Sequence, residues 1–401
     1  MRIALVTTEY VTEVNFDGGL SNYTYRTALS LAGLGHEPVV VVASDRREVI
    51  YHGGIEVHRV PVVWYHLVLR HVCKYVPCFD LVMISHALNV EIADIHAGSP
   101  IDLVQYTSLG GTAFFRDSRI PSVARLSSYQ KLCDAAYEVK PDLKTKLRQM
   151  LEVAALKKVD AVFGPSKLIG AEVAKDTGLT VDLIESPFVL DDCALSYDTY
   201  EEVQKELEGR DYLLFFGSLG LLKGVKAIGD MIYDLLSRNP QLSFVLVGKD
   251  LGYGGAPMFE YISDKAREHA NRLRHLDSIP HSRLYPLVEK SLCVVLPSRV
   301  DNFPNTCIEA MAFGKVVIGT RGTSFEQLIT DGVSGFLCEK DNPVSLRETI
   351  EKVARLDASQ RAEIGRNAYR RTLDLAPEKI VRELEILYGR VLERRRVGAR
   401  G

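Results

Sequence analysis

Two carboxylates in the last third of the chain, Asp301 and Glu309, have the spacing and surroundings of a ligand site. Asp301 lies in a polar loop, and Glu309 lies about one turn into a predicted helix that begins at Thr306. Carboxylates only accept hydrogen bonds, which suits them to paired hydroxyl groups, whereas the unpaired amides at a helix start suit a phosphate. A nucleotide sugar carries both kinds of group, so this stretch predicts a site for such a molecule.

The elements around these acids predict how they are positioned. A short apolar run at 293–296 reads as a buried parallel strand, the helix over 306–313 ends at Gly314, and 316–320 reads as a second buried strand. In open parallel sheets, ligands bind at the loop that leaves the carboxyl end of a strand. From composition alone, an alternative stays open: Asp301 is a turn residue and Glu309 an ordinary solvated helix glutamate.

The order of residues in this stretch resembles a known family. An acid, seven residues, Glu309, then Ala-Met-Ala-x-Gly and an apolar strand are similar to the donor-binding motif of GT4-type retaining glycosyltransferases, which have the GT-B fold. The resemblance implies that Glu309 holds the ribose hydroxyls and Asp301 the donor sugar, although the family usually has Glu at the place of Asp301. The donor-binding residues that it implies here are Asp301, Asn302, Phe303, Pro304, Asn305, Thr306 and Glu309.

A second loop, over 217–224, carries the lysine that could hold a diphosphate. Lys223 is followed by a glycine at a predicted helix start, where its ammonium would offset the charge of a leaving nucleotide. The loop resembles the family's Gly-Arg-x-x-x-x-Lys-Gly pattern, which implies donor contacts from Gly217, Ser218 and Lys223. Ser218 stands where the family usually has Arg. We therefore expect Asp301, Glu309 and Lys223 to be the catalytic residues.

The amino-terminal half begins with a strand, a glycine loop and a helix. Predicted strands over 2–7 and 38–43 flank Gly18 and Gly19, which precede a predicted helix over 23–32. Adjacent glycines let a backbone approach a ligand closely, or they serve only a tight turn. In the resembled family this loop faces the donor phosphates and the acceptor. Ser127 and Ser128 follow another predicted strand on the acceptor side, with Ser127 where many relatives carry His.

Length and composition predict two domains and exclude several kinds of site. The chain has 401 residues, a net charge of -3 and no Asp-x-Asp triplet, so we expect no attraction to nucleic acid and no metal cofactor. Its seven cysteines are dispersed, without zinc spacing, which indicates free thiols in a reducing compartment. Without a signal peptide or a long apolar run, we expect a cytoplasmic protein, at most attached to the inner face of the membrane.

Two segments leave a membrane contact open. The stretch 64–76 mixes large apolar residues with Arg70, His71 and Lys74, and reads either as a surface helix at lipid head groups or as a core-packed helix with a basic edge. The charged segment 140–158 reads either as a basic face for anionic lipid or polyanionic glycan, or as a solvated helix face.

We therefore predict an α/β protein of the GT-B fold, with two doubly wound Rossmann-like domains and a cleft between them. The predicted acceptor-side domain covers 1–190, with a helix of about 376–401 crossing back to it, and the nucleotide-sugar domain covers 191–375. The expected reaction moves a sugar from a nucleoside-diphosphate sugar to a hydroxyl of a glycan, a lipid-linked sugar or a small molecule. The alternatives are a nucleotide-sugar epimerase of the same fold and a catalytically silent sugar-nucleotide-binding subunit.

Overall fold

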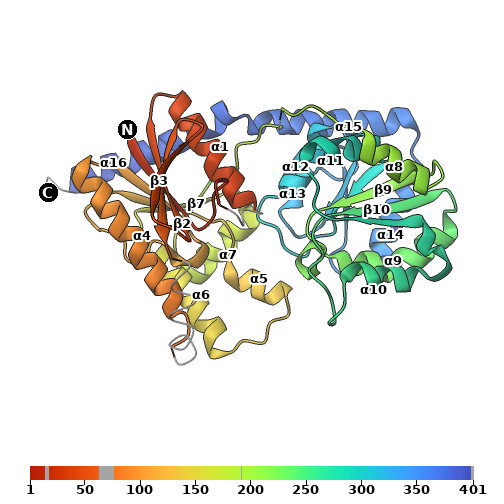
Figure 1. Ribbon diagram of the computed structural model, residues 1–401, viewed down its shortest axis with the longest axis horizontal. Coiled ribbons are helices and arrows are strands. Elements are labelled where there is room, and N and C mark those ends of the chain that lie inside the picture. The colour runs from red at the N-terminus through yellow and green to blue at the C-terminus, as the bar shows by residue number, and fades with distance from the viewer. Residues whose placement is uncertain (14–17, 63–75, 191, 399–401) are drawn as a thin grey trace. The chain divides into compact units, whose positions relative to one another are not determined.

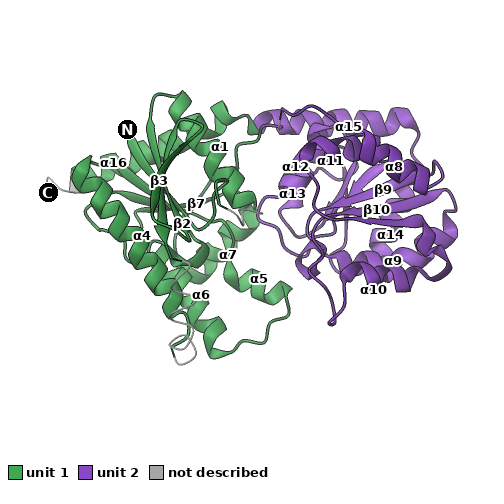
Figure 2. Cartoon of the chain, in the orientation of Figure 1, with its two compact units in different colours: residues 1–188, 375–401 green, residues 189–374 purple. Residues whose placement is uncertain are grey.

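The computed structural model describes residues 1–13, 18–62, 76–190 and 192–398. The chain forms two compact units (Figure 2). Unit 1 consists of residues 1–188 together with 375–401, and unit 2 consists of residues 189–374. The chain thus leaves unit 1 once and returns to it with its last helix.

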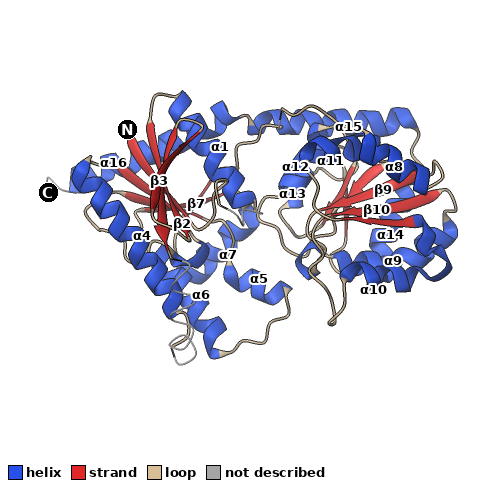
Figure 3. Cartoon of the chain, viewed as in Figure 1, coloured by secondary structure: helices blue, strands red, loops and turns tan. Residues whose placement is uncertain are grey.

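Unit 1 contains an eight-stranded sheet in the order β3-β4-β2-β1-β5-β6-β7-β8. Figure 3 shows strands in red and helices in blue. Every described pairing in it is parallel except that of β3 with β4. The strands are β1 (Arg2–Thr7), β2 (Glu37–Ser44), β3 (Glu48–His52), β4 (Ile55–Pro61), β5 (Leu103–Thr107), β6 (Ser122–Arg125), β7 (Ala161–Gly164) and β8 (Val181–Leu183). The helices are α1 (Gly19–Gly33), α4 (Phe79–Gly98), α5 (Gln130–Ala136), α6 (Leu143–Leu156), α7 (Lys167–Thr177) and α16 (Pro377–Gly398).

Helices cover both faces of this sheet because its central strands are apolar on both sides. Successive side chains of a strand point to opposite faces. Ile3 of β1 therefore belongs to one core with α1 and α16, and its neighbour Ala4 belongs to a second core with α4 and α6. The continuous apolar run of β2 follows the same rule. The last helix, α16, is thus a structural part of unit 1.

Unit 2 contains a six-stranded sheet in the order β11-β10-β9-β12-β13-β14, with parallel pairing throughout its described ladder. Figure 1 labels β9 and β10 of this sheet. The strands are β9 (Asp211–Phe216), β10 (Leu242–Val247), β11 (Leu273–Leu276), β12 (Cys293–Val295), β13 (Val317–Thr320) and β14 (Phe336–Cys338). The helices are α8 (Asp198–Glu206), α9 (Val225–Arg238), α10 (Met258–Ala266), α11 (His281–Lys290), α12 (Asn305–Ala312), α13 (Phe325–Leu328), α14 (Pro343–Ala354) and α15 (Ala358–Thr372).

Several element boundaries differ from those expected. The first helix begins at Gly19 instead of Tyr23, and the strand expected over 316–320 begins at Val317. The last strand, β14, begins at Phe336, after a turn closed by an isolated bridge between Asp331 and Gly335. The helix predicted over 64–76 falls almost entirely outside the described residues. Within the described part of the chain, no helix is both long enough and apolar enough to span a membrane.

Candidate functional site

The predicted donor residues of unit 2 meet at the point where the strand order reverses. From β9 the chain moves outward through β10 and β11, and then it returns to the other side of β9 with β12. The helices that follow β9 and β12 therefore lie on opposite faces of the sheet and leave a crevice at the carboxyl ends of these strands. The loop with Lys223 follows β9 and the loop with Asp301 follows β12. The topology thus brings two segments that are distant in sequence to one place.

Backbone contacts hold these two loops against each other. The amide of Arg299 donates to the carbonyl of Leu222 at 2.8 Å. Gly224 has a φ of 67°, and a Cβ at this position would lie 1.8 Å from the carbonyl oxygen of Pro297. A side chain at residue 224 would therefore collide with backbone, and only glycine permits this approach. The close contact between Gly224 and Pro297 therefore fixes the backbone next to Lys223.

Lys223 and Asp301 form an ion pair. The Nζ of Lys223 lies 2.5 Å from Oδ2 of Asp301, and their side chains are 31% and 12% exposed. The backbone carbonyl of Asp301 also accepts a hydrogen bond from Oγ of the buried Ser324 at 2.7 Å. This bond ties the Asp301 loop to the segment that follows β13. The structure thus brings together two predicted residues to which the resemblance gives different parts of the donor.

The helix α12 presents its amino terminus beside this pair. It begins at Asn305, after Pro304, and its first turn contains Thr306. Its N-cap residue is Pro304, whose side chain makes no capping hydrogen bond, and the first amides of a helix lack intrahelical partners, so they can donate to a ligand. Glu309 lies in its second turn and is only 7% exposed. Nearby, burial and the charge of Asp301 raise the pKa of the Cys307 thiol well above its usual value.

The remaining predicted residues of unit 2 belong to the same loops. Gly217 follows β9 with a φ of 134°, and a Cβ there would lie 3.9 Å from Cγ2 of Thr306. Ser218 comes next and is half-buried. Phe303 is 7% exposed, so its side chain anchors the loop rather than facing solvent. Their donor contacts stay a prediction.

In unit 1, Gly18 and Gly19 form the start of α1, with Gly18 as its extended N-cap residue. A Cβ at Gly18 would lie 2.7 Å from Oε2 of Glu9. A carboxylate therefore approaches the positive end of this helix, where the resemblance implies a phosphate. The donor contact of these glycines stays a prediction.

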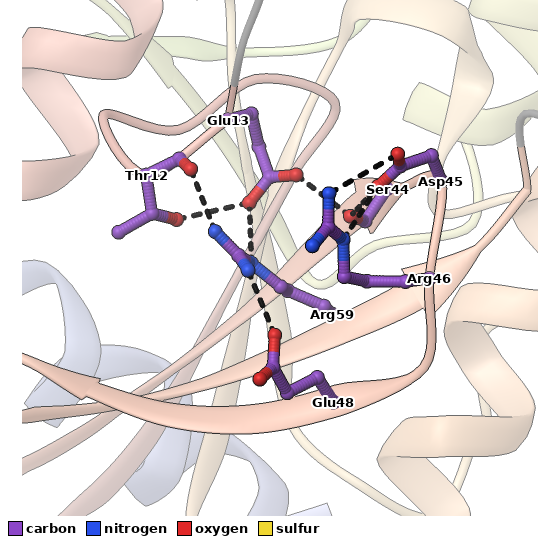
Figure 4. A network of polar contacts seen from close by, with 7 residues as sticks. All are labelled: Thr12, Glu13, Ser44, Asp45, Arg46, Glu48 and Arg59. Atoms are coloured by element: carbon purple, nitrogen blue, oxygen red, sulfur yellow. Dashed lines mark hydrogen bonds and ion pairs between the residues drawn. The ribbon is translucent and has the colours of Figure 1, made fainter.

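The described part of the loop between β1 and α1 is anchored by one arginine (Figure 4). Arg59 of β4 donates to the Glu13 carboxylate at 2.9 Å, to Glu48 at 2.8 Å and to the Thr12 carbonyl at 2.6 Å. Ser44 at the end of β2 donates to the other oxygen of Glu13 at 2.7 Å. Arg59 is thus a positioning residue for this loop, and it escaped the sequence analysis because its partners are distant in sequence.

Ser127 and Ser128 follow β6 and belong to a hydrogen-bonded network. The hydroxyls of Ser127 and Thr107 lie 2.6 Å apart, and Oγ of Ser108 donates to the carbonyl of Ser128 at 3.0 Å. Beneath them, Arg125 stacks on the ring of Tyr23 at 3.6 Å. Burial lowers the pKa of Arg125 from its ordinary value.

None of the six described cysteines forms a disulfide bond with another described residue. No group of three or more His, Cys, Asp or Glu side chains among the described residues is arranged to hold a metal ion.

Two family models match the chain. The model described as "Glycosyl transferases group 1" matches residues 196–371, and the model described as "Glycosyl transferase 4-like domain" matches residues 18–182. The two matches fall in unit 2 and unit 1 respectively.

Curated relatives match over different shares of their length. "Uncharacterized glycosyltransferase MJ1178" of Methanocaldococcus jannaschii is 30% identical over 38% of this chain and 41% of the relative. "GDP-mannose-dependent alpha-mannosyltransferase" of Corynebacterium glutamicum is 24% identical over 98% of this chain and 89% of the relative. The chain spans about two fifths of the length of several other curated relatives it matches.

Among solved structures, sucrose-phosphate synthase of Thermosynechococcus elongatus superposes with a TM-score of 0.78 at 19% identity. The match covers 98% of this chain and 99% of that one. It confirms the predicted arrangement of two parallel sheets with flanking helices.

Proposed function

Because the chain belongs to the GT4-type glycosyltransferases of the GT-B fold, we propose that it transfers a sugar from a nucleoside-diphosphate sugar to an acceptor hydroxyl. One observation carries this proposal: Lys223, Asp301 and the start of α12 gather at the reversal point of the unit 2 sheet. A nucleotide sugar needs a cation and backbone amides for its phosphates, and a carboxylate that accepts hydrogen bonds from its hydroxyls.

Each residue has a role that its chemistry supports. Lys223 offsets the negative charge that grows on the leaving diphosphate, and the first amides of α12 donate to the same phosphates. Glu309 holds the two ribose hydroxyls through its two carboxylate oxygens. Asp301 accepts hydrogen bonds from the donor sugar. The Lys223–Asp301 ion pair opens when the donor enters, since each partner then takes a part of the ligand.

In the proposed step, the acceptor oxygen forms a bond to the anomeric carbon while the bond from that carbon to the diphosphate oxygen breaks. The acceptor proton passes to an oxygen of the leaving phosphate. Attack from the same face retains the anomeric configuration. We propose that the step needs no metal ion, with Lys223 and the helix amides supplying the electrostatic stabilisation.

The first test is thermal-shift binding of UDP, GDP, ADP, TDP and CDP without metal. We expect stabilisation by one diphosphate, followed by transfer activity with sugars carried on that base. The relative named for GDP-mannose puts GDP first in this panel. If no diphosphate binds to the well-folded protein, the donor site is wrong. If a diphosphate binds but no acceptor in a broad panel is glycosylated, the transfer proposal fails.

Analysis of the product tests whether the anomeric configuration is retained and whether the protein is an epimerase instead. We expect NMR of the product to show the anomeric configuration of the donor. An inverted product would overturn retention. Release of an epimerised sugar in the absence of acceptor would show an epimerase instead.

A further inference from the structure

Unit 1 has its own reversal point, between β1 and β5, and a pocket lies there. From β1 the chain moves outward through β2, β4 and β3, and then it returns to the other side of β1 with β5. The loops that follow β1 and β5 contribute Thr8 and Gly110 to a pocket of about 400 Å³. This volume lies in the range of small-molecule sites, and the position is the one expected for a ligand in an open parallel sheet.

One side of this pocket is apolar. Its walls include Ala43 of β2, Val62 after β4, Leu81 and Ile84 of α4, and Leu109 after β5. These side chains come from four different segments, so the apolar side of the pocket is an extended surface rather than a single residue. Apolar walls of this kind favour an apolar body of matching size, because its burial removes surface from water.

The other side is polar, and two buried polar atoms of residues that line the pocket lack a hydrogen-bond partner among the described residues. This side is lined by Gln130, Arg148 and Glu152. The backbone amide of Gln130 donates to Oε2 of the buried Glu152 at 2.9 Å. Within the described residues, the buried Nε of Arg148 and the buried Oγ1 of Thr8 have no hydrogen-bond partner. Both atoms are shielded from solvent, so a polar ligand group in the pocket would meet the accessible part of the Arg148 guanidinium, whose side chain is 36% exposed.

This polar side is continuous with the predicted acceptor residues. Ser127 and Ser128 lie in the loop that follows β6, and this loop leads into α5, which begins at Gln130. Oγ of Ser108 accepts a hydrogen bond from the backbone amide of Ser127 at 3.1 Å and donates one to the carbonyl of Ser128 at 3.0 Å. The loop that carries the predicted acceptor residues therefore leads directly into one wall of the pocket.

We propose that this pocket binds the apolar part of an amphipathic acceptor, with the polar part of that acceptor against Gln130, Arg148 and Glu152. The acceptor is then an alkyl or aryl glycoside or alcohol rather than a wholly polar sugar. This inference rests on the proposed transfer function and names the acceptor class for it.

The test measures binding of methyl, butyl, hexyl, octyl and dodecyl β-D-glucoside to the full chain by titration calorimetry, below the concentrations at which they form micelles. Each added methylene should tighten binding up to about fourfold while the chain is still entering the pocket. Affinity that levels off with the longer chains indicates a small apolar aglycone, and affinity that still rises at dodecyl indicates a lipid chain. Equal affinity across the series would overturn the proposal.

Variants locate the binding in this pocket. Ala43→Phe should fill the pocket and remove the dependence on chain length, and Leu81→Trp provides the same test if Ala43→Phe does not fold. Val90→Phe adds a ring on the exposed side of α4, where Val90 is 44% exposed, and should leave the series unchanged. Unchanged octyl glucoside binding in folded Ala43→Phe or Leu81→Trp would refute the assignment.

Diphosphate binding separates this inference from the proposed function. We expect the pocket variants to keep the thermal shift with the nucleoside diphosphate, because the donor residues that carry the proposal lie in unit 2. Diphosphate binding without any alkyl-chain preference refutes only the acceptor class. Absence of diphosphate binding in the unmodified chain refutes the donor site, while the alkyl series still reports on the pocket.

Discussion

Replacing Asp301 by Asn should make a nucleoside diphosphate bind more tightly. In the structure, Lys223 is held by Asp301 at 2.5 Å. A diphosphate must draw the lysine away from this partner, so part of its binding free energy is used to open the pair. Asparagine keeps the shape of the side chain but removes the charge, which leaves Lys223 available.

The size of the effect follows from the exposure of the pair. Hydrogen bonds between charged groups contribute about 1.5–3 kcal/mol when protected, and exposed ion pairs about 0–1 kcal/mol. With side-chain exposures of 31% and 12%, the pair lies between these cases, so we take about 1.4 kcal/mol. That free energy corresponds to about a tenfold lower dissociation constant for the diphosphate.

The assay is titration calorimetry with the diphosphate that the thermal-shift panel identifies. Asp301→Asn should tighten its binding on the wild-type background and change nothing on a Lys223→Met background. Asp230→Asn is the matched control, because Lys226 and Asp230 of α9 form a similar pair at 2.6 Å. Weaker binding by Asp301→Asn, or the same effect with and without Lys223, would refute the reasoning.

Four further changes test the site and its support. Glu309→Ala should weaken donor binding by about 1.5–3 kcal/mol in calorimetry and leave the circular dichroism spectrum unchanged; unchanged affinity would remove Glu309 from the ribose. Gly224→Ala should lower the free energy of unfolding in urea by about 2–3 kcal/mol, because its Cβ would collide with the carbonyl of Pro297; a stability equal to wild type would contradict this contact. Burial raises the pKa of Glu152 from 4.5 to about 7, so the folded chain binds this proton more strongly than the unfolded chain, and its contribution to stability is lost as pH rises from about 4.5 to 7. The unfolding free energy of wild type relative to Glu152→Gln should fall by about 3 kcal/mol over that window, and parallel pH profiles would show that Glu152 titrates normally. Burial raises the pKa of the Cys293 thiol to about 12, so iodoacetamide at pH 8 should modify Cys293 only in denaturant, as mass spectrometry of native and unfolded samples would show.

The fold class and most strands could be predicted because parallel strands covered on both faces are continuous apolar runs. β1 was found at its predicted bounds, and β2 extends one residue beyond its predicted bounds at each end. β11 was not predicted, because Arg274 and His275 interrupt its apolar character at the edge of the sheet. The edge strand β3 escaped for the same reason, since most of its side chains face solvent.

The contacts within the site could not be predicted from residue types. Lys223 and Asp301 lie 78 positions apart, and only the placement of β12 beside β9 brings them together. The segment 140–158 was interpreted as a basic or a solvated helix face, although Ala155 and Leu156, three and four positions after Glu152, already indicated that this side of the helix is buried. Spacing identified which residues have suitable chemistry, whereas strand order determined which of them meet.

The return of α16 to unit 1 has a consequence for the synthesis of the protein. Tyr388 of this helix is buried and donates to Oε1 of Gln105 in β5 at 2.6 Å, and Arg390 pairs with Asp182 of β8. On the ribosome, all of unit 2 is synthesised before α16, which carries these contacts to the sheet of unit 1. The domain that is translated first is therefore completed last, and until then the face that α16 covers is exposed to chaperones and to other nascent chains.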